Sequence, residues 1–88
     1  MNAPKRTRHE IVLEILAALE IEPHRKTEIV YGHNLGFQPA GKILADLQER
    51  GMVAWDAKSR LFSLEPAGQK ALTHLRKGME LIEEAIPA

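Results

Sequence analysis

Residues 27–64, TEIVYGHNLGFQPAGKILADLQERGMVAWDAKSRLFSL, decide the fold. This stretch begins with two apolar patterns at helical spacing, separated by turn-forming residues at 32–36. It ends with two segments, 52–55 and 61–64, that are rich in β-branched and aromatic side chains and are joined by the polar residues 56–60. We therefore expect two helices connected by a tight turn and followed by a β-hairpin.

The boundaries of these two helices follow from their end residues. The shorter helix is predicted over residues 28–33, because the hydroxyl of Thr27 is suited to accept a hydrogen bond from the first turn. The longer helix is predicted over residues 37–50, with Pro39 in its first turn and Gly51 directly after its end. Four apolar residues of the longer helix are expected to face inward: Ala40, Ile43, Leu44 and Leu47.

Helices are also predicted on both sides of this stretch. Residues 7–20 carry apolar side chains at helical spacing, and Pro23 prevents that helix from continuing. A last helix is predicted from Pro66 to about residue 86, and Pro87 ends it. The order of three helices, a two-stranded hairpin and a long C-terminal helix is that of a mainly α winged helix-turn-helix domain.

Several segments also carry a family resemblance. They are RTRHEIVLEIL at 6–16, KTEIVY at 26–31, Asn34-Leu35, the pattern Leu44-x-x-Leu47-x-x-x-Gly51 and LEPAG at 64–68. Together they resemble a family of small archaeal winged-helix DNA-binding proteins that dimerise through a long C-terminal helix in an antiparallel coiled coil. The resemblance covers nearly the whole chain and implies a homodimer that binds double-stranded DNA.

The composition limits the classes of function. The chain has 88 residues, with 12 Lys and Arg against 12 Asp and Glu, so it is expected to be one domain over residues 1–88 without net charge. Any nucleic-acid surface must therefore come from the arrangement of charges and not from their sum. Cysteine is absent, which excludes a disulfide framework and a thiolate zinc site. The apolar runs are too short to span a membrane, so a soluble, cytoplasmic protein is expected.

Candidate DNA-binding residues come from three places in the chain. On the helix of residues 37–50 they are expected to reach base edges or phosphates, and in the hairpin turn they are expected to reach the DNA backbone. Before the second helix they are expected to bind phosphate. The six candidates are Gln38, Lys42, Lys58, Arg60, Arg25 and Lys26.

Other residues of this surface leave alternatives open. Gly41 and Ala45 are small, which would let the helix approach DNA closely, whereas Asp46 and Glu49 would repel phosphate and favour an ordinary solvated face. The N-terminal residues 5–9 are basic enough to form an arm on DNA, and they are equally typical of surface residues that only confer solubility.

An apolar stripe on the last predicted helix repeats every three and four residues, as in a coiled coil: Leu72, Leu75, Met79, Ile82 and Ile86. The first two of these residues are close enough to the hairpin to join the domain core. We expect the segment 66–86 to be a dimerisation helix that pairs through Leu75, Met79, Ile82 and Ile86. The alternative is that this helix folds back on the first helix of its own chain.

No pattern in the sequence indicates catalysis. The four histidines, His9, His24, His33 and His74, lack metal-ligand spacing, and no nucleophile or phosphate-loop motif is present, so no enzyme activity, cofactor or metal is expected. The leading hypothesis is a homodimeric double-stranded DNA-binding protein, either a transcriptional regulator or an architectural protein. The alternative is a winged-helix module that binds another protein and no DNA, which the absence of net charge permits.

Overall fold

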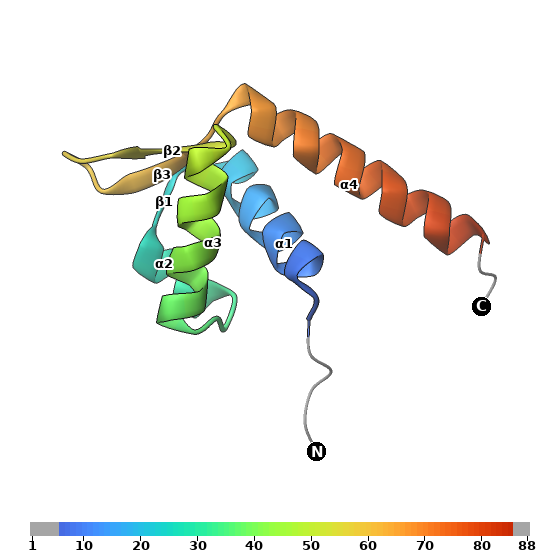
Figure 1. Ribbon diagram of the computed structural model, residues 1–88, viewed down its shortest axis with the longest axis horizontal. Coiled ribbons are helices and arrows are strands. Elements are labelled where there is room, and N and C mark those ends of the chain that lie inside the picture. Colours follow the sequence, from blue (N-terminus) through green and yellow to red (C-terminus); the bar gives the residue numbers. More distant parts are fainter. Residues whose placement is uncertain (1–5, 86–88) are drawn as a thin grey trace, which may run out of the picture.

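The computed structural model describes residues 6–85, which form four helices and a small antiparallel sheet at one side of the helices (Figure 1). The elements in chain order are α1 (Arg8–Ile21), β1 (His24–Arg25), α2 (Lys26–Gly32), α3 (Phe37–Glu49), β2 (Val53–Asp56), β3 (Leu61–Leu64) and α4 (Pro66–Ala85). In Figure 1 the hairpin of β2 and β3, here called the wing, projects to the left and α4 leaves to the right. This arrangement confirms the predicted winged helix-turn-helix fold.

Side-chain caps set the starts of α1 and α2. The Oγ1 of Thr7 accepts a hydrogen bond from the backbone N–H of Glu10 at 3.1 Å, so α1 begins close to the predicted position. The expected cap of α2 is wrong, because Thr27 lies inside the helix and Arg25 is the N-cap residue. The Glu28 carboxylate accepts a hydrogen bond from the Arg25 N–H at 2.7 Å, which stabilises this earlier start.

The sheet has one strand more than the predicted hairpin. Its order is β1-β3-β2, and β1 pairs with β3 through His24 opposite Phe62 and Arg25 opposite Leu61. A two-residue strand shows no alternation along the sequence, and it is recognised only through its pairing with β3. The chain between α1 and α2 is consequently hydrogen-bonded to the wing.

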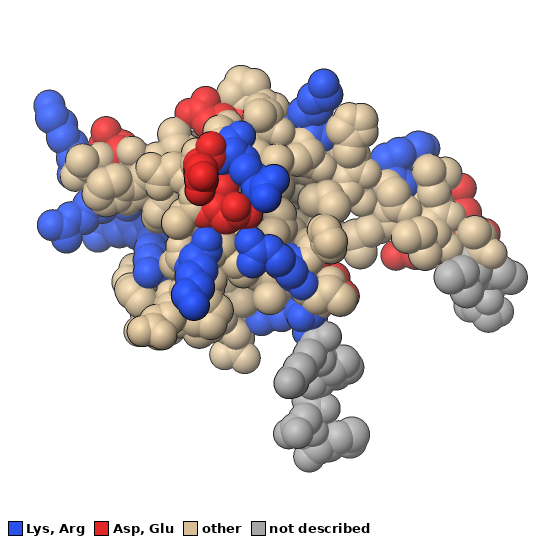
Figure 2. Space-filling view, viewed as in Figure 1, with Lys and Arg blue, Asp and Glu red and all other residues tan. Residues whose placement is uncertain are grey.

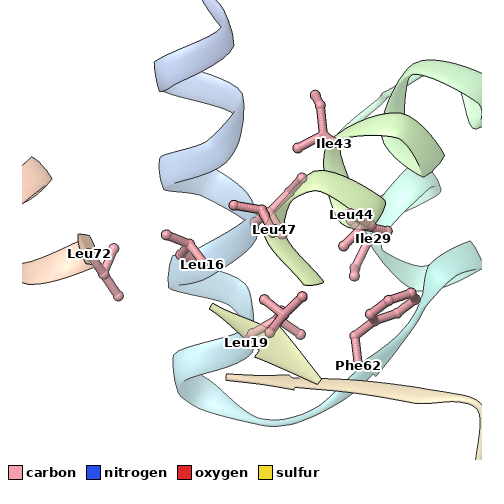
Figure 3. Packing of buried hydrophobic residues seen from close by; sticks show 10 residues of the cluster. Leu16, Leu19, Ile29, Ile43, Leu44, Leu47, Phe62 and Leu72 are labelled. Carbon is pink, nitrogen blue, oxygen red and sulfur yellow. The ribbon is translucent and has the colours of Figure 1, made fainter. Parts of the chain in front are cut away.

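The core lies between the three N-terminal helices, the sheet and the start of α4. The predicted inward face of α3 is confirmed, because Ala40, Ile43, Leu44 and Leu47 are all buried. Figure 3 shows how the side chains of α1, α3 and β3 meet there. The main cluster of buried residues is Ile15, Leu16, Leu19, Ile29, Ile43, Leu44, Leu47, Val53, Phe62 and Leu72.

A close approach at the start of α4 fixes the direction of this helix. A Cβ atom at Gly68 would fall on the carbonyl oxygen of Met52 and on the side chain of Leu64, so only glycine fits between α4 and the sheet. Leu72 is fully buried behind this contact, and Leu75 packs partly against the core. Both residues therefore belong to the domain core, as expected.

Beyond this point α4 extends away from the other helices (Figure 1). Met79 is 39% exposed, Leu81 is 52% exposed and Ile82 is 59% exposed. The alternative that the helix folds back on α1 is therefore wrong for residues 79–82. Ile86, the last residue of the predicted stripe, lies outside the described residues. Among residues 6–85, no helix combines the length and the apolar character needed to cross a membrane.

Candidate nucleic-acid interface

The exposed side of α3 carries the residues that were predicted to read DNA. Gln38 and Lys42 are both exposed, and they line a shallow hollow of about 260 Å³ together with Arg8, Pro39 and Ile43. Because the opposite face of α3 is packed in the core, the backbone that carries these side chains is rigid. In the sequence Arg8 is a candidate only as part of the N-terminal arm of residues 5–9, and the hollow places it beside α3.

The acidic end of α3 is compensated by two arginines of the same chain. The carboxylate of Asp46 accepts hydrogen bonds at 3.1 Å from the Nε of Arg50 and, also at 3.1 Å, from the Nη2 of Arg8. The pKa of Asp46 is lowered mainly by the hydrogen bonds from Arg50, with a smaller contribution from Arg8. The predicted repulsion between Asp46 and a phosphate is therefore reduced.

The turn of the wing is held by its own hydrogen bonds. The Oδ2 of Asp56 accepts from the backbone N–H of Ser59 at 2.8 Å and from its hydroxyl at 2.7 Å, and these bonds lower the pKa of Asp56. Arg60 follows with a left-handed backbone, φ 61°, which is strained for a residue with a Cβ. Lys58 and Arg60 are both exposed, as the prediction of backbone contacts requires.

A second hollow, of about 470 Å³, lies between the start of α2 and the wing. Its walls come from residues of both elements: Arg25, Lys26, Thr27, Trp55, Arg60 and Phe62. The ring centroids of Trp55 and Phe62 are 6.4 Å apart, and Trp55 is 44% exposed. The hollow is therefore lined by two aromatic rings and by three cationic side chains, those of Arg25, Lys26 and Arg60. The backbone N–H of Arg25 donates a hydrogen bond to Glu28, so at this predicted phosphate site the side chains of Arg25 and Lys26, and not this N–H, are available to an anion.

The space above Gly41 is occupied by a lysine of α2. A Cβ at Gly41 would lie 2.7 Å from the Nζ of Lys26, and this ammonium lies 3.9 Å from the centroid of the Phe37 ring. The expectation that Gly41 is small so that DNA can approach therefore requires correction, because the glycine makes room for Lys26. A mid-helix glycine costs about 0.5–1 kcal/mol relative to alanine, and this contact supplies the physical reason for it.

The ion pairs divide the basic residues into two groups. Arg6 is paired with Glu14 at 2.9 Å and also donates to the carbonyl oxygen of Asn34, so this part of the proposed N-terminal arm is held against the domain. Lys5 lies outside the described residues. Arg8, Arg50 and Arg76 also have acidic partners.

Five basic side chains, which lie on β1, α2, α3 and the turn of the wing, have no ion pair with any residue between 6 and 85. We call this set the basic face: Arg25, Lys26, Lys42, Lys58 and Arg60. Figure 2 shows basic side chains over the wing and over α2 and α3 on one side of the molecule, while acidic side chains are visible beside them on the wing, at the upper end of α3 and on the distal part of α4.

A family profile described as winged helix-turn-helix matches residues 5–83. The chain belongs to this family. Helix-turn-helix domains typically place the second helix of the motif in the major groove of DNA. The family is therefore one of DNA-binding domains and not of enzymes, in agreement with the expectation from the sequence.

Two solved structures share the winged-helix fold with this chain. The transcriptional regulator BldR from Sulfolobus solfataricus aligns with a TM-score of 0.74 and 20% identity over 85% of this chain and 58% of that one. ZitR from Lactococcus lactis aligns with a TM-score of 0.61 and 19% identity over 97% of this chain and 64% of that one. The chain thus spans about three fifths of the length of each structure. No curated protein sequence matches it.

Two residues of this winged-helix surface, Arg8 and Trp55, could not be recognised as neighbours of the candidates from the sequence. Arg8 reaches α3 only because α1 packs across it, and Trp55 was interpreted as a strand residue of the hairpin without a role in binding. The signal for Trp55 is its position directly before the polar turn of the wing, residues 56–60.

Proposed function

We propose that this chain is a homodimeric, double-stranded DNA-binding regulator. Its α3 would lie in the major groove, with Gln38 and Lys42 directed at base edges and phosphates. The backbone on either side would be contacted by Lys58 and Arg60 of the wing and by Arg25 and Lys26 at the start of α2. This assignment keeps all six residues expected from the sequence.

The observation that carries the proposal is the distribution of paired and unpaired charge. The chain has no net charge, yet the basic face leaves five cations without an ion-pair partner among the described residues. Asp46, the acidic residue of α3 nearest to them in the helix, is bound by Arg8 and Arg50. A local excess of positive charge on the surface that this fold uses for DNA supports electrostatic binding.

The basic face is also continuous between α3 and the wing. Lys26 lines the hollow beside Trp55 and Arg60, and its ammonium lies over Phe37 at the beginning of α3. A duplex that follows α3 would therefore meet cations from α2 and the wing, with the exposed rings of Trp55 and Phe37 between them. Because apolar contacts at the centre of an interface also suit a protein partner, the salt dependence of binding separates the two functions.

The distal half of α4, residues 76–85, supports the dimer. Met79 and Ile82 continue the heptad of Leu72 and Leu75 and are exposed in the single chain. A second copy that packs on this seam would remove these side chains from water, which contributes about 1.5–3 kcal/mol for each before the cost of association. Residues 66–86 would then form the dimerisation segment of a single domain.

The decisive experiment measures affinity for duplex DNA as a function of salt. Each phosphate that the protein neutralises adds about −0.9 to the slope of log affinity against log salt, so we expect a slope of about −4 to −9 for the dimer. Trp55 is the only tryptophan and lines the hollow of the basic face, so its fluorescence reports binding without a label.

Matched variants locate the contact. Lys42→Gln should weaken binding and flatten the slope by about one for each subunit, whereas Lys70→Gln, the same charge change on α4, should do neither. If the wild-type protein does not bind DNA at low salt, the function is that of the protein-binding module. A comparison of genomic fragments then separates a regulator, which prefers particular sites, from an architectural protein, which does not.

A further inference from the structure

Lys26 is held in one place although it is a long and flexible side chain. Its Nζ lies 3.9 Å from the centre of the Phe37 ring, within the range of a cation–π contact. Its Nζ and Cε also fill the space above Gly41, where a Cβ would be 2.7 Å and 3.4 Å from them. Three residues from two helices therefore fix one ammonium group at the junction of α2 and α3.

The ammonium has not used its hydrogen-bond donors. Lys26 makes no side-chain hydrogen bond or ion pair within the described part of the chain, although it is only partly exposed. The Phe37 ring is 51% exposed and contacts the cation with its face, which leaves the N–H groups free for another partner. Arg25 and Arg60 line the same hollow, so the partner that fits this place is an anion.

We propose that Lys26 is a pre-positioned phosphate contact, and that Gly41 and Phe37 are the positioning residues that hold it in register with Gln38 and Lys42. This inference rests on the proposed DNA-binding function and assigns roles to two residues that carry no charge. The oxygen that Lys26 binds is that of a backbone phosphate beside the groove occupied by α3.

The strength of a lysine–phosphate contact depends on the conformational freedom that the side chain loses when it binds. A free lysine loses its rotamer freedom when it binds a phosphate, and this loss weakens the contact. In the unbound protein the ring of Phe37 and the open space at Gly41 favour one arrangement of Lys26, so less of that freedom remains to be lost on binding. The contact is therefore stronger than that of a wing lysine, and it also places α3 at a fixed distance from the DNA backbone.

The test uses the full chain, a mixed-sequence duplex of about three helical turns and four variants. Gly41→Ala adds only the methyl group that displaces the lysine, and alanine favours the helix, so its unfolding temperature should not fall. Its DNA affinity should nevertheless fall about three- to tenfold at low salt. Lys26→Met should lower the affinity at least as much and should flatten the salt slope by about one for each subunit.

The double variant Lys26→Met with Gly41→Ala shows whether the glycine acts through the lysine. We expect the double variant to bind no more weakly than Lys26→Met alone, because the methyl group then has nothing to displace. Phe37→Leu keeps the apolar volume and removes the ring face, and it should give a smaller loss of affinity with an unchanged slope. This variant preserves the test if Gly41→Ala does not fold.

Two results would overturn the inference while the proposed function stands. In one, the wild-type protein binds the duplex with the expected salt slope, and Gly41→Ala and Phe37→Leu both bind equally well. In the other, Gly41→Ala weakens binding as much in the Lys26→Met background as in the wild type, which would mean that the helix surface itself is blocked. Absence of any binding by the wild type would overturn both the function and the inference.

Discussion

The basic face and the distal half of α4 are both unsatisfied surfaces, but they differ in what they lack. On the basic face the missing partners are anions, because five cations have no ion pair with a described residue. On the distal half of α4 the missing partner is apolar, because Met79 and Ile82 face solvent. Salt screens the first kind of attraction and leaves the second almost unchanged, so the two surfaces can be tested independently.

The largest expected effect is on the apolar surface. Ile82→Glu should convert the dimer to a monomer, because it removes two apolar side chains from the seam and brings two carboxylates into it. We expect the dissociation constant of the dimer to rise more than about a hundredfold. Light scattering should report about twice the 9.9 kDa chain mass for the wild type and the chain mass for the variant.

A matched change gives the control for this result. Lys77→Gln alters the charge by the same amount at a heptad position opposite the seam, and it should leave the dimer intact. A wild-type protein that is monomeric at high micromolar concentration would contradict the dimer. Equal loss of the dimer in Lys77→Gln would place the contact on another face of α4.

The next effect separates α3 from the wing. Lys58 and Arg60 are exposed on a turn, so replacing both with alanine should weaken binding similarly on a preferred and a scrambled duplex. Gln38 projects from a helix that is packed in the core, and Gln38→Ala should reduce the preference between duplexes by about 1–3 kcal/mol. If the wing variant erases the preference and Gln38→Ala weakens both duplexes equally, the two roles are reversed.

Asp46 offers a smaller change that acts in the opposite direction. Asp46→Asn frees Arg8 and Arg50 near α3, and it should raise DNA affinity by less than about tenfold, whereas Glu84→Gln on α4 should not. The pKa of Asp46 is lowered by Arg50 and Arg8, so its stabilisation of the fold is present above the ordinary aspartate pKa and is lost as the pH falls through the lower folded value. The free energy of unfolding of the wild type should therefore lose the contribution of Asp46 when the pH is lowered, whereas that of Asp46→Asn should show no such loss.

The smallest expected effect is at the left-handed residue of the wing. Arg60→Gly should raise the free energy of unfolding by about 0.5–1 kcal/mol, because glycine adopts φ 61° without strain. The same variant should bind DNA more weakly, since a cation of the basic face is lost. Arg60→Ala loses the cation and keeps the strained backbone, so urea denaturation should show no gain; equal stability of the two variants would contradict the assignment of strain.

The sequence predicts the features that depend on local periodicity. The spacing of apolar residues gave all four helices, and the segments around Trp55 and Phe62 gave the hairpin, because each pattern is complete within a few neighbouring residues. The short strand β1, the ion pairs of Asp46 and the notch at Gly41 were not predictable in this way. Apart from the Asp46–Arg50 pair, which lies within one helical turn, each of them joins residues distant in sequence, and their proximity exists only after the helices have packed.

The residues of the candidate site could likewise be chosen from local sequence patterns, but their contacts with distant residues could not be predicted. The types and positions of the cations could be chosen from the sequence, but their pairing state could not, because nothing local distinguishes the paired Arg8 from the unpaired Arg25. Whether a basic residue is available for a partner depends on which acidic residue the fold brings beside it. This is why a chain without net charge can still present a basic face.

The position of β3 between β1 and β2 determines where the wing can change its length. Both edges of β3 are hydrogen-bonded, one to the connection that begins α2 and the other to β2, so an extra residue within β3 would shift the register of two pairings at once. Within the hairpin we therefore expect insertions in the connection of residues 57–60 and not in β3. Variation of wing length among relatives should concentrate there, and the reach of the wing toward a second groove could be redesigned at this turn without altering the helices.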